Sequence, residues 1–243
     1  MGQLDGSVAI ITGASTGIGK GIAIAFAHEG ASLVLAARTR STLDEAARDV
    51  AASGAEVQAV PTDVTDERQV AALFEAAVER FGRVDILVNN AGVFDGGPVD
   101  ELDPAVWRMV VEVNLTAPFL CTREAMRIMK TQGSGRILNI GSISSNMPRM
   151  NSAAYTATKH GLVGLTKSTA LEGRAFGVSA SCLNPGNTLT EWRADATAAM
   201  NSEPMMGTAD FARVVVMAAA LPGHINMLDV TVLPVEQPYL GRG

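Results

Sequence analysis

Cysteine and histidine are scarce in this chain of 243 residues. The two cysteines, Cys121 and Cys182, lie far apart in apolar runs, so they form neither a disulfide framework nor a CxxC zinc pattern. The three histidines, His28, His160 and His224, are not spaced as metal ligands, which argues against a zinc hydrolase. We expect two buried thiols in a reducing compartment and no bound metal.

Positive charge and long hydrophobic runs are also in short supply. The 19 Lys and Arg residues face 25 Asp and Glu residues, a net charge of −6, whereas a sequence-independent nucleic-acid binder needs a basic surface. The longest apolar run, 214–221, is far shorter than the roughly 20 residues of a membrane-spanning helix. No secretory signal pattern precedes the first predicted strand. We therefore expect a cytoplasmic protein without nucleic-acid or membrane partners.

What the chain does contain is a regular alternation of short β-branched runs and alanine-rich helical patterns. Strands are predicted over 8–11, 33–35, 56–60, 84–88, 136–140, 178–183 and 228–233, and helices over 17–28, 41–52, 65–81, 104–131, 152–176 and 208–220. The first strand lacks polar alternation, which indicates burial on both faces. The pattern predicts one α/β domain over residues 1–243, a doubly wound Rossmann-type parallel sheet of about seven strands with helices on both faces.

Such sheets bind ligands beyond the carboxyl ends of their strands, so the residues that follow each strand are the candidate site. The first strand runs into a glycine-rich turn with the spacing GxxxGxG, which opens a helix. Glycine-rich turns are common, but this strand–turn–helix context favours a pyrophosphate held by backbone N–H groups and the helix N-terminus. The predicted cofactor contacts here are Gly13, Ser15, Thr16, Gly17, Ile18 and Gly19.

The end of the second strand carries Arg38 where a dinucleotide fold specific for NAD(H) places an acid for the ribose hydroxyls. The planar guanidinium suits a 2′-phosphate, which favours NADP(H) as the cofactor. The alternative is NAD(H), with Arg38 as a solvated loop charge.

Two further strand ends complete the predicted nucleotide site. Asp63 and Val64 follow the third strand and are expected beside the adenine, although Asp63 equally suits the start of the next helix. Asn90, Ala91 and Gly92 follow the fourth strand and leave room for the adenine ribose, although such residues also form ordinary turns.

A second group of polar residues follows the fifth strand. Ser142 comes directly after that strand, and Tyr155 and Lys159 follow one helical turn apart on the same helix face. A lysine cation in this position favours the tyrosinate form and suits the phenol for proton exchange. The combination of the three residues beside a nucleotide turn predicts acid/base chemistry.

These motifs together resemble the short-chain dehydrogenase/reductase family in its compact single-domain branch. The matching segments are TGxxxGIG at 12–19, NNAG at 89–92, Asn114, Ser142, YxxxK at 155–159, and Pro185 with Gly186. They occur in the order and at the spacing of the family, from residue 7 to about residue 190.

The resemblance implies a role for each matching residue. Tyr155 would exchange a proton with the substrate oxygen, Ser142 would hydrogen-bond that oxygen, and Lys159 would hold the nicotinamide ribose. Asn114 would hold a relay water through its backbone carbonyl. Tyr155, Lys159, Pro185, Gly186, Thr188 and Thr190 would contact the nicotinamide half of the cofactor.

The expected function is therefore an NADP(H)-dependent oxidoreductase that interconverts a ketone, an aldehyde or a 3-oxo acid with the corresponding alcohol. The C-terminal segment is similar to that of NADP-dependent 3-hydroxy acid (serine-type) dehydrogenases. Alternatives are a 3-oxoacyl-[acyl-carrier-protein] reductase-like enzyme, an NAD-dependent alcohol dehydrogenase and a non-catalytic cofactor sensor. The intact Ser142, Tyr155, Lys159 and Asn114 favour an enzyme.

The resemblance also implies a substrate lid over 187–207 and a subunit interface. Trp192 in the lid, with Ser142 and Tyr155, is expected to contact the substrate; alternatively it packs the lid onto the body. Arg149 and Arg193 could bind a substrate carboxylate, but we expect both to point to solvent. The helices at 104–131 and 152–176 carry apolar residues on more than one face, which favours a homotetramer, with a dimer as the alternative.

Overall fold

The computed structural model of the protein describes residues 2–191 and 203–238. Its centre is a parallel sheet of seven strands, as the sequence predicts, and the strands lie in the order β3-β2-β1-β4-β5-β6-β9. The strands are β1 (Val8–Thr12), β2 (Ser32–Ala37), β3 (Val57–Pro61), β4 (Ile86–Asn89), β5 (Gly135–Ile140), β6 (Val178–Pro185) and β9 (Asp229–Val232). The strand order reverses between β1 and β4, which is where a doubly wound sheet opens a crevice for a ligand.

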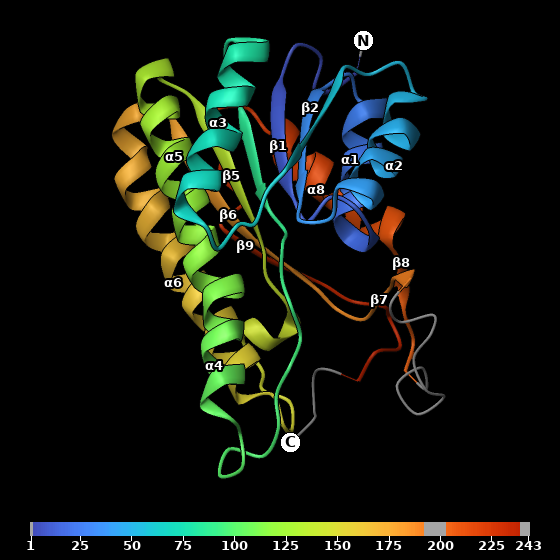
Figure 1. The fold of residues 1–243 in the computed structure, drawn as a ribbon, viewed down its shortest axis with the longest axis vertical. Coiled ribbons are helices and arrows are strands. Elements are labelled where there is room, and N and C mark those ends of the chain that lie inside the picture. Colours follow the sequence, from blue (N-terminus) through green and yellow to red (C-terminus); the bar gives the residue numbers. More distant parts are fainter. Residues whose placement is uncertain (1, 192–202, 239–243) are drawn as a thin grey trace.

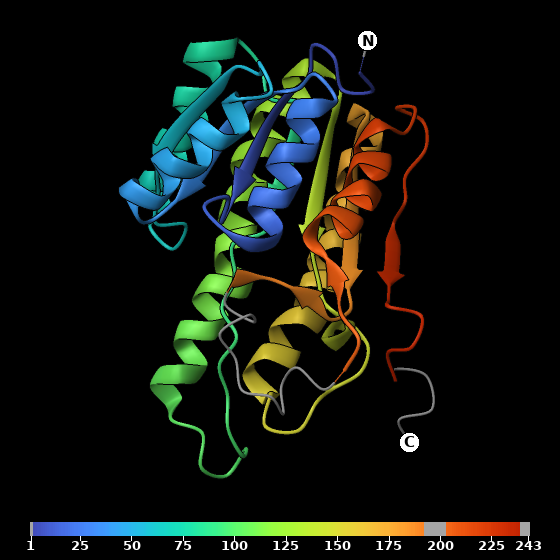
Figure 2. The same ribbon diagram turned by 90° about the vertical axis from the view of Figure 1, so that its right-hand side faces the viewer.

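Helices cover both faces of this sheet (Figures 1 and 2). One layer contains α1 (Gly17–His28), α2 (Arg40–Ala51) and α8 (Thr208–Ala220), and the other contains α3 (Glu67–Phe81), α5 (Ala117–Gln132) and α6 (Ala153–Gly173). Each layer packs its apolar stripe onto one face of the sheet. Phe26 and Phe211 centre the first core, and Phe74 and Met129 belong to the second. Both cores are closed to water, which fixes the strand ends where the predicted site lies.

Several helix ends follow from local sequence. The Asp66 carboxylate accepts hydrogen bonds from the N–H groups of Arg68 and Gln69 and so caps α3, which ends at Gly82 in the left-handed conformation. Helix α2 begins at Arg40, one residue earlier than predicted, and its N-cap residue Thr39 makes no side-chain cap. Helix α6 begins at Ala153, directly after its N-cap residue Ser152, and ends at Gly173. A short 3₁₀ turn, η3 (Arg174–Phe176), follows it.

The long helix predicted over 104–131 is three segments. Asp103 caps α4 (Pro104–Val111). A π-turn, η1 (Glu112–Thr116), follows α4, and α5 begins directly after this turn. A π-turn inserts one extra residue into the helical ladder and is common at functional sites. Periodicity alone does not reveal it, because the apolar residues keep an approximately helical spacing across it.

A buried polar ladder ties the middle of the sheet to the second helix layer. Asn89 Nδ2 donates to Asn139 Oδ1 at 2.8 Å, and Asn139 Nδ2 donates to Thr166 Oγ1 at 2.8 Å. Asn89, the first residue of the NNAG segment, therefore has a structural role. Every polar atom in such a ladder needs its partner, because an unpaired buried group costs about 1–3 kcal/mol.

Arg136 anchors the opposite end of the sheet. This buried residue of β5 donates to the backbone carbonyls of Leu221, Pro222 and Ile225, which lie just beyond the end of α8. Burial lowers the pKa of its guanidinium. The side chain thus holds the connection between α8 and β9 through hydrogen bonds to neutral carbonyls at the negative end of a helix.

Two strands too short to be predicted lie beyond the carboxyl end of the sheet. β7 (Thr188–Leu189) and β8 (Met206–Gly207) pair in parallel and bracket part of the segment expected to be a lid. Trp192 and Arg193, which the sequence analysis singled out, lie outside the described residues. The assignment of 187–207 as a lid remains a prediction.

Candidate active site

The glycine-rich turn between β1 and α1 forms one wall of a cavity of about 390 Å³. Gly17 has a positive φ of 55°, which places the first N–H groups of α1 toward that cavity. Gly19 lies against the turn itself: a Cβ there would come within 2.3 Å of the Gly13 carbonyl oxygen. The turn is therefore closed to larger residues, and its backbone lies close to the cavity.

Asn90 fastens this turn to the end of β4. Its Nδ2 donates to the carbonyl oxygens of Thr12 at 3.0 Å and Gly13 at 3.1 Å, and the Thr12 hydroxyl accepts from the N–H groups of Asn90 and Ala91. Asn90 is a predicted cofactor contact, and it lines the cavity. Its side-chain NH2 group is used to hold the two loops together.

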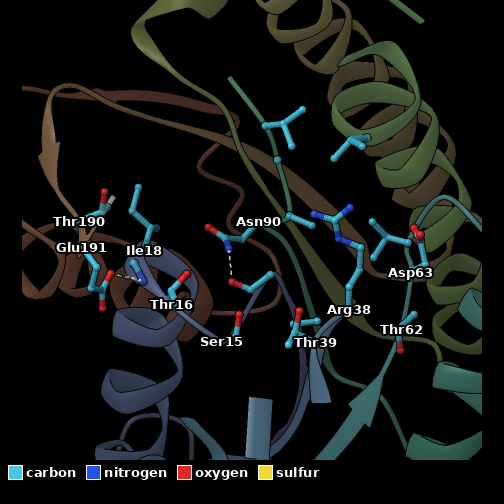
Figure 3. A pocket seen from close by; sticks show the side chains of 18 residues that line it. Ser15, Thr16, Ile18, Arg38, Thr39, Thr62, Asp63, Asn90, Thr190 and Glu191 are labelled. Atoms are coloured by element: carbon cyan, nitrogen blue, oxygen red, sulfur yellow. Dashed lines mark hydrogen bonds between the residues drawn. The ribbon is translucent and has the colours of Figure 1, made fainter. Parts of the chain in front are cut away.

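Arg38 and Asp63 lie at the other end of the cavity. Figure 3 shows the Arg38 side chain rising from the end of β2 between Asn90 and Asp63. Asp63 Oδ1 accepts hydrogen bonds from the N–H and hydroxyl of Thr65, and these bonds, with a smaller contribution from the nearby Arg38 cation, lower the pKa of the Asp63 carboxyl. Asp63 is not the cap of α3, because Asp66 fills that position.

The cavity brings together most of the predicted nucleotide contacts. The predicted residues that line it are Gly13, Ser15, Thr16, Gly17, Ile18, Arg38, Asp63, Val64, Asn90, Ala91, Gly92 and Thr190. The lining also includes Glu191, whose carboxylate accepts a hydrogen bond from the Gly17 N–H at 2.8 Å (Figure 3). A carboxylate at this position demonstrates that the start of α1 can receive an anion. The residues present therefore fit a dinucleotide.

Ser142 is positioned by the residues that follow β5. Its N–H donates to Asn184 Oδ1 and Ser145 Oγ, each at 3.2 Å, and its own Oγ accepts from the Ser144 N–H at 3.1 Å. Because the Oγ accepts this bond, its hydroxyl proton can still be donated to a ligand. The short 3₁₀ turn η2 (Ile143–Ser145) thus orients Ser142 as a hydrogen-bond donor.

Tyr155 and Lys159 lie together on the first turns of α6. The Lys159 ammonium is 5.5 Å from the centre of the Tyr155 ring. The rings of Phe94 and Tyr155 form a T-shaped pair with their centroids 5.0 Å apart. Lys159 is buried, and its Nζ donates to the Ile140 carbonyl at 2.8 Å. This bond ties α6 to the end of β5, directly before Ser142. Phe94 was not identified from the sequence, since a lone aromatic after a turn carries no signal.

Asn114 lies in the π-turn η1, fully buried. Its Oδ1 accepts from the Val93 N–H and its Nδ2 donates to the Val93 carbonyl, both at 2.8 Å. The side chain is thus occupied with the loop after β4, which leaves the backbone as the part of Asn114 that could serve a relay. η1 also lies beside α6, because a Cβ on Gly161 would come within 3.0 Å of the Leu115 side chain.

The residues after β6 form the remaining wall. The Gly186 N–H donates to the Val232 carbonyl at 2.7 Å, and the Thr188 hydroxyl donates to the Gly186 carbonyl at 3.2 Å. Thr188 is therefore engaged within its own turn, whereas Thr190 reaches the cavity. Pro185 is the buried last residue of β6. The lining of this cavity does not include the other predicted site residues, which are Gly19, Asn114, Ser142, Tyr155, Lys159, Pro185, Gly186 and Thr188.

Asn184, Asn187 and Gln237 support this wall and were missed. Asn184 bridges the Ser142 N–H and Asp229, to which its Nδ2 donates at 2.6 Å. Gln237 is buried, and its Oε1 accepts from the Asn187 N–H at 2.8 Å. Asn184 could have been identified from the sequence because it directly precedes Pro185 and Gly186. Asn187 and Gln237 could not, because they bond to each other across distant segments of the chain.

We expected the Arg149 side chain to point to solvent, but it packs against the segment after β6. Its guanidinium donates to Asn187 Oδ1 at 3.0 Å and lies 3.9 Å from the carboxylate of Glu203, which also accepts from Asn187 Nδ2. The backbone of Arg149 is tied to Ser152, the N-cap residue of α6. Arg149 thus joins the start of the helix that carries Tyr155 to the segment after β6.

Both cysteines are buried, as predicted. Burial raises the pKa of Cys121 to about 12 and that of Cys182 to about 11, so both thiols are protonated near neutral pH. Within residues 2–191 and 203–238, no group of three or more His, Cys, Asp or Glu side chains is arranged to hold a metal ion. Among the described helices, none combines the length and apolar character that crossing a bilayer requires.

Comparison with known proteins identifies the family. The family model for the short chain dehydrogenases matches residues 7–201, which include the glycine-rich turn, Ser142, Tyr155 and Lys159. The chain belongs to the short-chain dehydrogenase family. It is an oxidoreductase that uses a nicotinamide cofactor and acts on a small molecule at an alcohol or carbonyl carbon.

The relatives of this short-chain dehydrogenase are named for different substrates. It is 41% identical over 180 residues to the cis-4-hydroxycyclohexanecarboxylate dehydrogenase of Sinomonas cyclohexanicum, covering 74% of this chain and 72% of the relative. It is 36% identical over 214 residues to the 3-oxoacyl-[acyl-carrier-protein] reductase of Synechocystis sp., covering 88% and 85%. Among solved structures, a metagenomic short-chain oxidoreductase in complex with NADP superimposes with a TM-score of 0.83 at 36% identity, covering 96% and 98%.

Proposed function

We propose that this short-chain dehydrogenase is an NADP(H)-dependent enzyme that reduces a ketone or aldehyde to an alcohol, or catalyses the reverse reaction. The observation that carries the cofactor preference is Arg38. It lies at the end of β2 on the cavity wall, in a segment, 36–40, without an acid. A guanidinium there forms charge-assisted hydrogen bonds to a 2′-phosphate, whereas a carboxylate would bind ribose hydroxyls.

The nucleotide half of the cofactor would be held by the walls of this cavity. The N–H groups at the start of α1 would bind the pyrophosphate, and Ser15 would assist Arg38 at the 2′-phosphate. Asp63 and Val64 would face the adenine, and Asn90 would hold the turn in shape. That a relative of 36% identity was solved in complex with NADP supports a nicotinamide dinucleotide as the ligand.

The catalytic half would be formed by Ser142, Tyr155 and Lys159. In the reductive direction the Tyr155 hydroxyl donates its proton to the carbonyl oxygen, and the Ser142 hydroxyl hydrogen-bonds the same oxygen as negative charge develops. The Lys159 ammonium, 5.5 Å from the Tyr155 ring, stabilises the phenolate left after proton transfer. The bound nicotinamide supplies the hydride that reaches the carbonyl carbon.

The proton on Tyr155 must be replaced after each turnover. Lys159 lies between Tyr155 and the Ile140 carbonyl, and η1 with Asn114 packs beside the same helix. A water on the Asn114 carbonyl would connect the Lys159 ammonium to solvent. Thr190 would bind the nicotinamide carboxamide, and Trp192 would contact the substrate.

The experiment that tests the cofactor proposal is a titration of the purified protein with NADPH and NADH, followed by tryptophan fluorescence. We expect much tighter binding of NADPH, and then turnover on a panel of ketones and aldehydes that includes 3-oxo acids. Tighter binding of NADH would overturn the role of Arg38 and favour an NAD-dependent alcohol dehydrogenase. Failure to bind either would favour a non-catalytic protein.

We also propose a homotetramer. Large apolar side chains are exposed on the helices expected to form an interface: Trp107 is 41% exposed, Phe119 48% and Leu171 63%. Exposed apolar side chains that gather into one patch are typical of subunit contacts. Light scattering should give a tetramer mass, and Phe119→Asp should lower it. A monomer mass at every protein concentration would refute the proposal.

A further inference from the structure

The carboxylate at the start of α1 comes from a distant part of the chain. Helix α1 has no acid in its first turn, and the side chain of its N-cap residue, Thr16, makes no cap hydrogen bond. Glu191 supplies the missing acceptor, with its Oε2 at 2.8 Å from the Gly17 nitrogen. By contrast, α3 and α4 are capped by their own aspartates, Asp66 and Asp103. The contact at α1 is therefore a long-range one that local helix formation does not require.

The same N–H group is the one that the cofactor pyrophosphate would use. Glycine at 17, with its positive φ, directs this N–H into the cavity, and Glu191 lines that cavity. A backbone N–H bonds only one strong acceptor well, and a carboxylate and a pyrophosphate repel each other. Glu191 and a pyrophosphate thus compete for one position.

The neighbouring residue is part of the same contact. A Cβ on Gly17 would come within 3.2 Å of Thr190 Cγ2 and 3.8 Å of Glu191 Oε2, so both residues lie over the start of α1. The lining of the cavity includes Thr190 and Glu191 but neither Ser142 nor Tyr155. Glu191 therefore belongs to the nucleotide cavity and not to the group of residues expected to do the chemistry.

We propose that Glu191 is an internal competitor of the cofactor: its carboxylate occupies the pyrophosphate position at Gly17 in the cofactor-free enzyme and must leave before the cofactor binds fully. The contact is autoinhibitory, and it lowers the affinity for NADPH and NADH alike because both carry the pyrophosphate. The inference rests on the proposed cofactor site but not on the preference for NADP(H).

The test is the affinity of Glu191→Gln for three ligands, measured by calorimetry. NADPH and NADH should each bind about tenfold more tightly than to the wild type, because the neutral amide is a weaker acceptor and does not repel the pyrophosphate. Adenosine 2′-monophosphate, which has no group to place at Gly17, should bind with unchanged affinity. Asp103→Asn is the matched control, since it also removes one carboxylate from a helix N-terminus but away from the cavity, and it should change none of the three.

The outcomes separate this inference from the proposed function. If the wild type binds NADPH and Glu191→Gln binds it no more tightly, the competition is refuted while the function stands. Equal tightening of adenosine 2′-monophosphate would also refute it, because the effect would then be a general change of charge. If the wild type binds neither NADPH nor NADH, both proposals fall.

A second measurement needs no cofactor. Hydrogen exchange of the peptide that contains Gly17 should be faster in cofactor-free Glu191→Ala than in the wild type, because the N–H loses its acceptor. NADPH should then protect that peptide in both proteins. Identical exchange in the two cofactor-free proteins would show that Glu191 does not occupy the position in solution.

Discussion

Replacement of Arg38 by aspartate tests the cofactor assignment most directly. The guanidinium lies on the cavity wall between Asn90 and Asp63, where a 2′-phosphate would reach it (Figure 3). A charge-assisted hydrogen bond contributes about 1.5–3 kcal/mol. The new carboxylate adds repulsion of about 1 kcal/mol, the value for two charges about 4 Å apart in water. The sum of about 3 kcal/mol corresponds to a loss of NADPH affinity of roughly a hundredfold.

The affinity for NADH should move little or in the opposite direction. An aspartate at the end of β2 can accept hydrogen bonds from the ribose hydroxyls, which the wild-type residue cannot do. Calorimetry on the wild type and on Arg38→Asp therefore compares the ratio of NADPH affinity to NADH affinity. General damage to the fold would weaken both cofactors alike and would leave this ratio unchanged. We expect the NADPH-to-NADH affinity ratio to fall by at least a hundredfold.

Arg40→Asp is the matched control for this experiment. Arg40 lies two residues further along, its side chain is 70% exposed, and it pairs with Asp44 outside the cavity. The control makes the same change of charge and should leave the ratio within about twofold, because charges in water are screened over about 10 Å. A ratio that falls equally in both variants, or in neither, would refute the role of Arg38.

Three further predictions concern the catalytic residues and the sheet. Tyr155→Phe should lower turnover at least a hundredfold while NADPH affinity stays within about twofold, because only the proton donor is lost; a variant with near wild-type kcat would remove Tyr155 from the chemistry. Lys159→Met should weaken NADPH binding about tenfold and also lower kcat, since the ammonium serves both the ribose and Tyr155; unchanged cofactor affinity would contradict the ribose contact. Arg136→Met should lower the free energy of unfolding in urea by about 3 kcal/mol, because the carbonyls of Leu221, Pro222 and Ile225 lose their donor. The exposed Arg174→Met is its control, and equal stability of the two variants would show that the buried guanidinium contributes nothing.

Local sequence determined much of this protein. Buried strands without polar alternation and helices of regular period predict the seven-stranded parallel sheet and its two helix layers. The glycine-rich turn and Arg38 could be placed in the nucleotide cavity because each follows a strand directly, and parallel strands end at one edge of the sheet. Tyr155 and Lys159 could be placed together because one helical turn separates them.

Only the tertiary structure decided how these residues are held. Asn90 looked like a cofactor ligand but uses its amide to join two loops, and Asp63 is held by Thr65 and is not a helix cap. Glu191 contacts Gly17 across a separation of 174 residues, and no local pattern encodes that contact. Hydrogen bonds between distant segments depend on the relative placement of whole strands and helices. The sequence therefore determined which groups stand at the strand ends, and the packing of the two layers determined which of them remain available to a ligand.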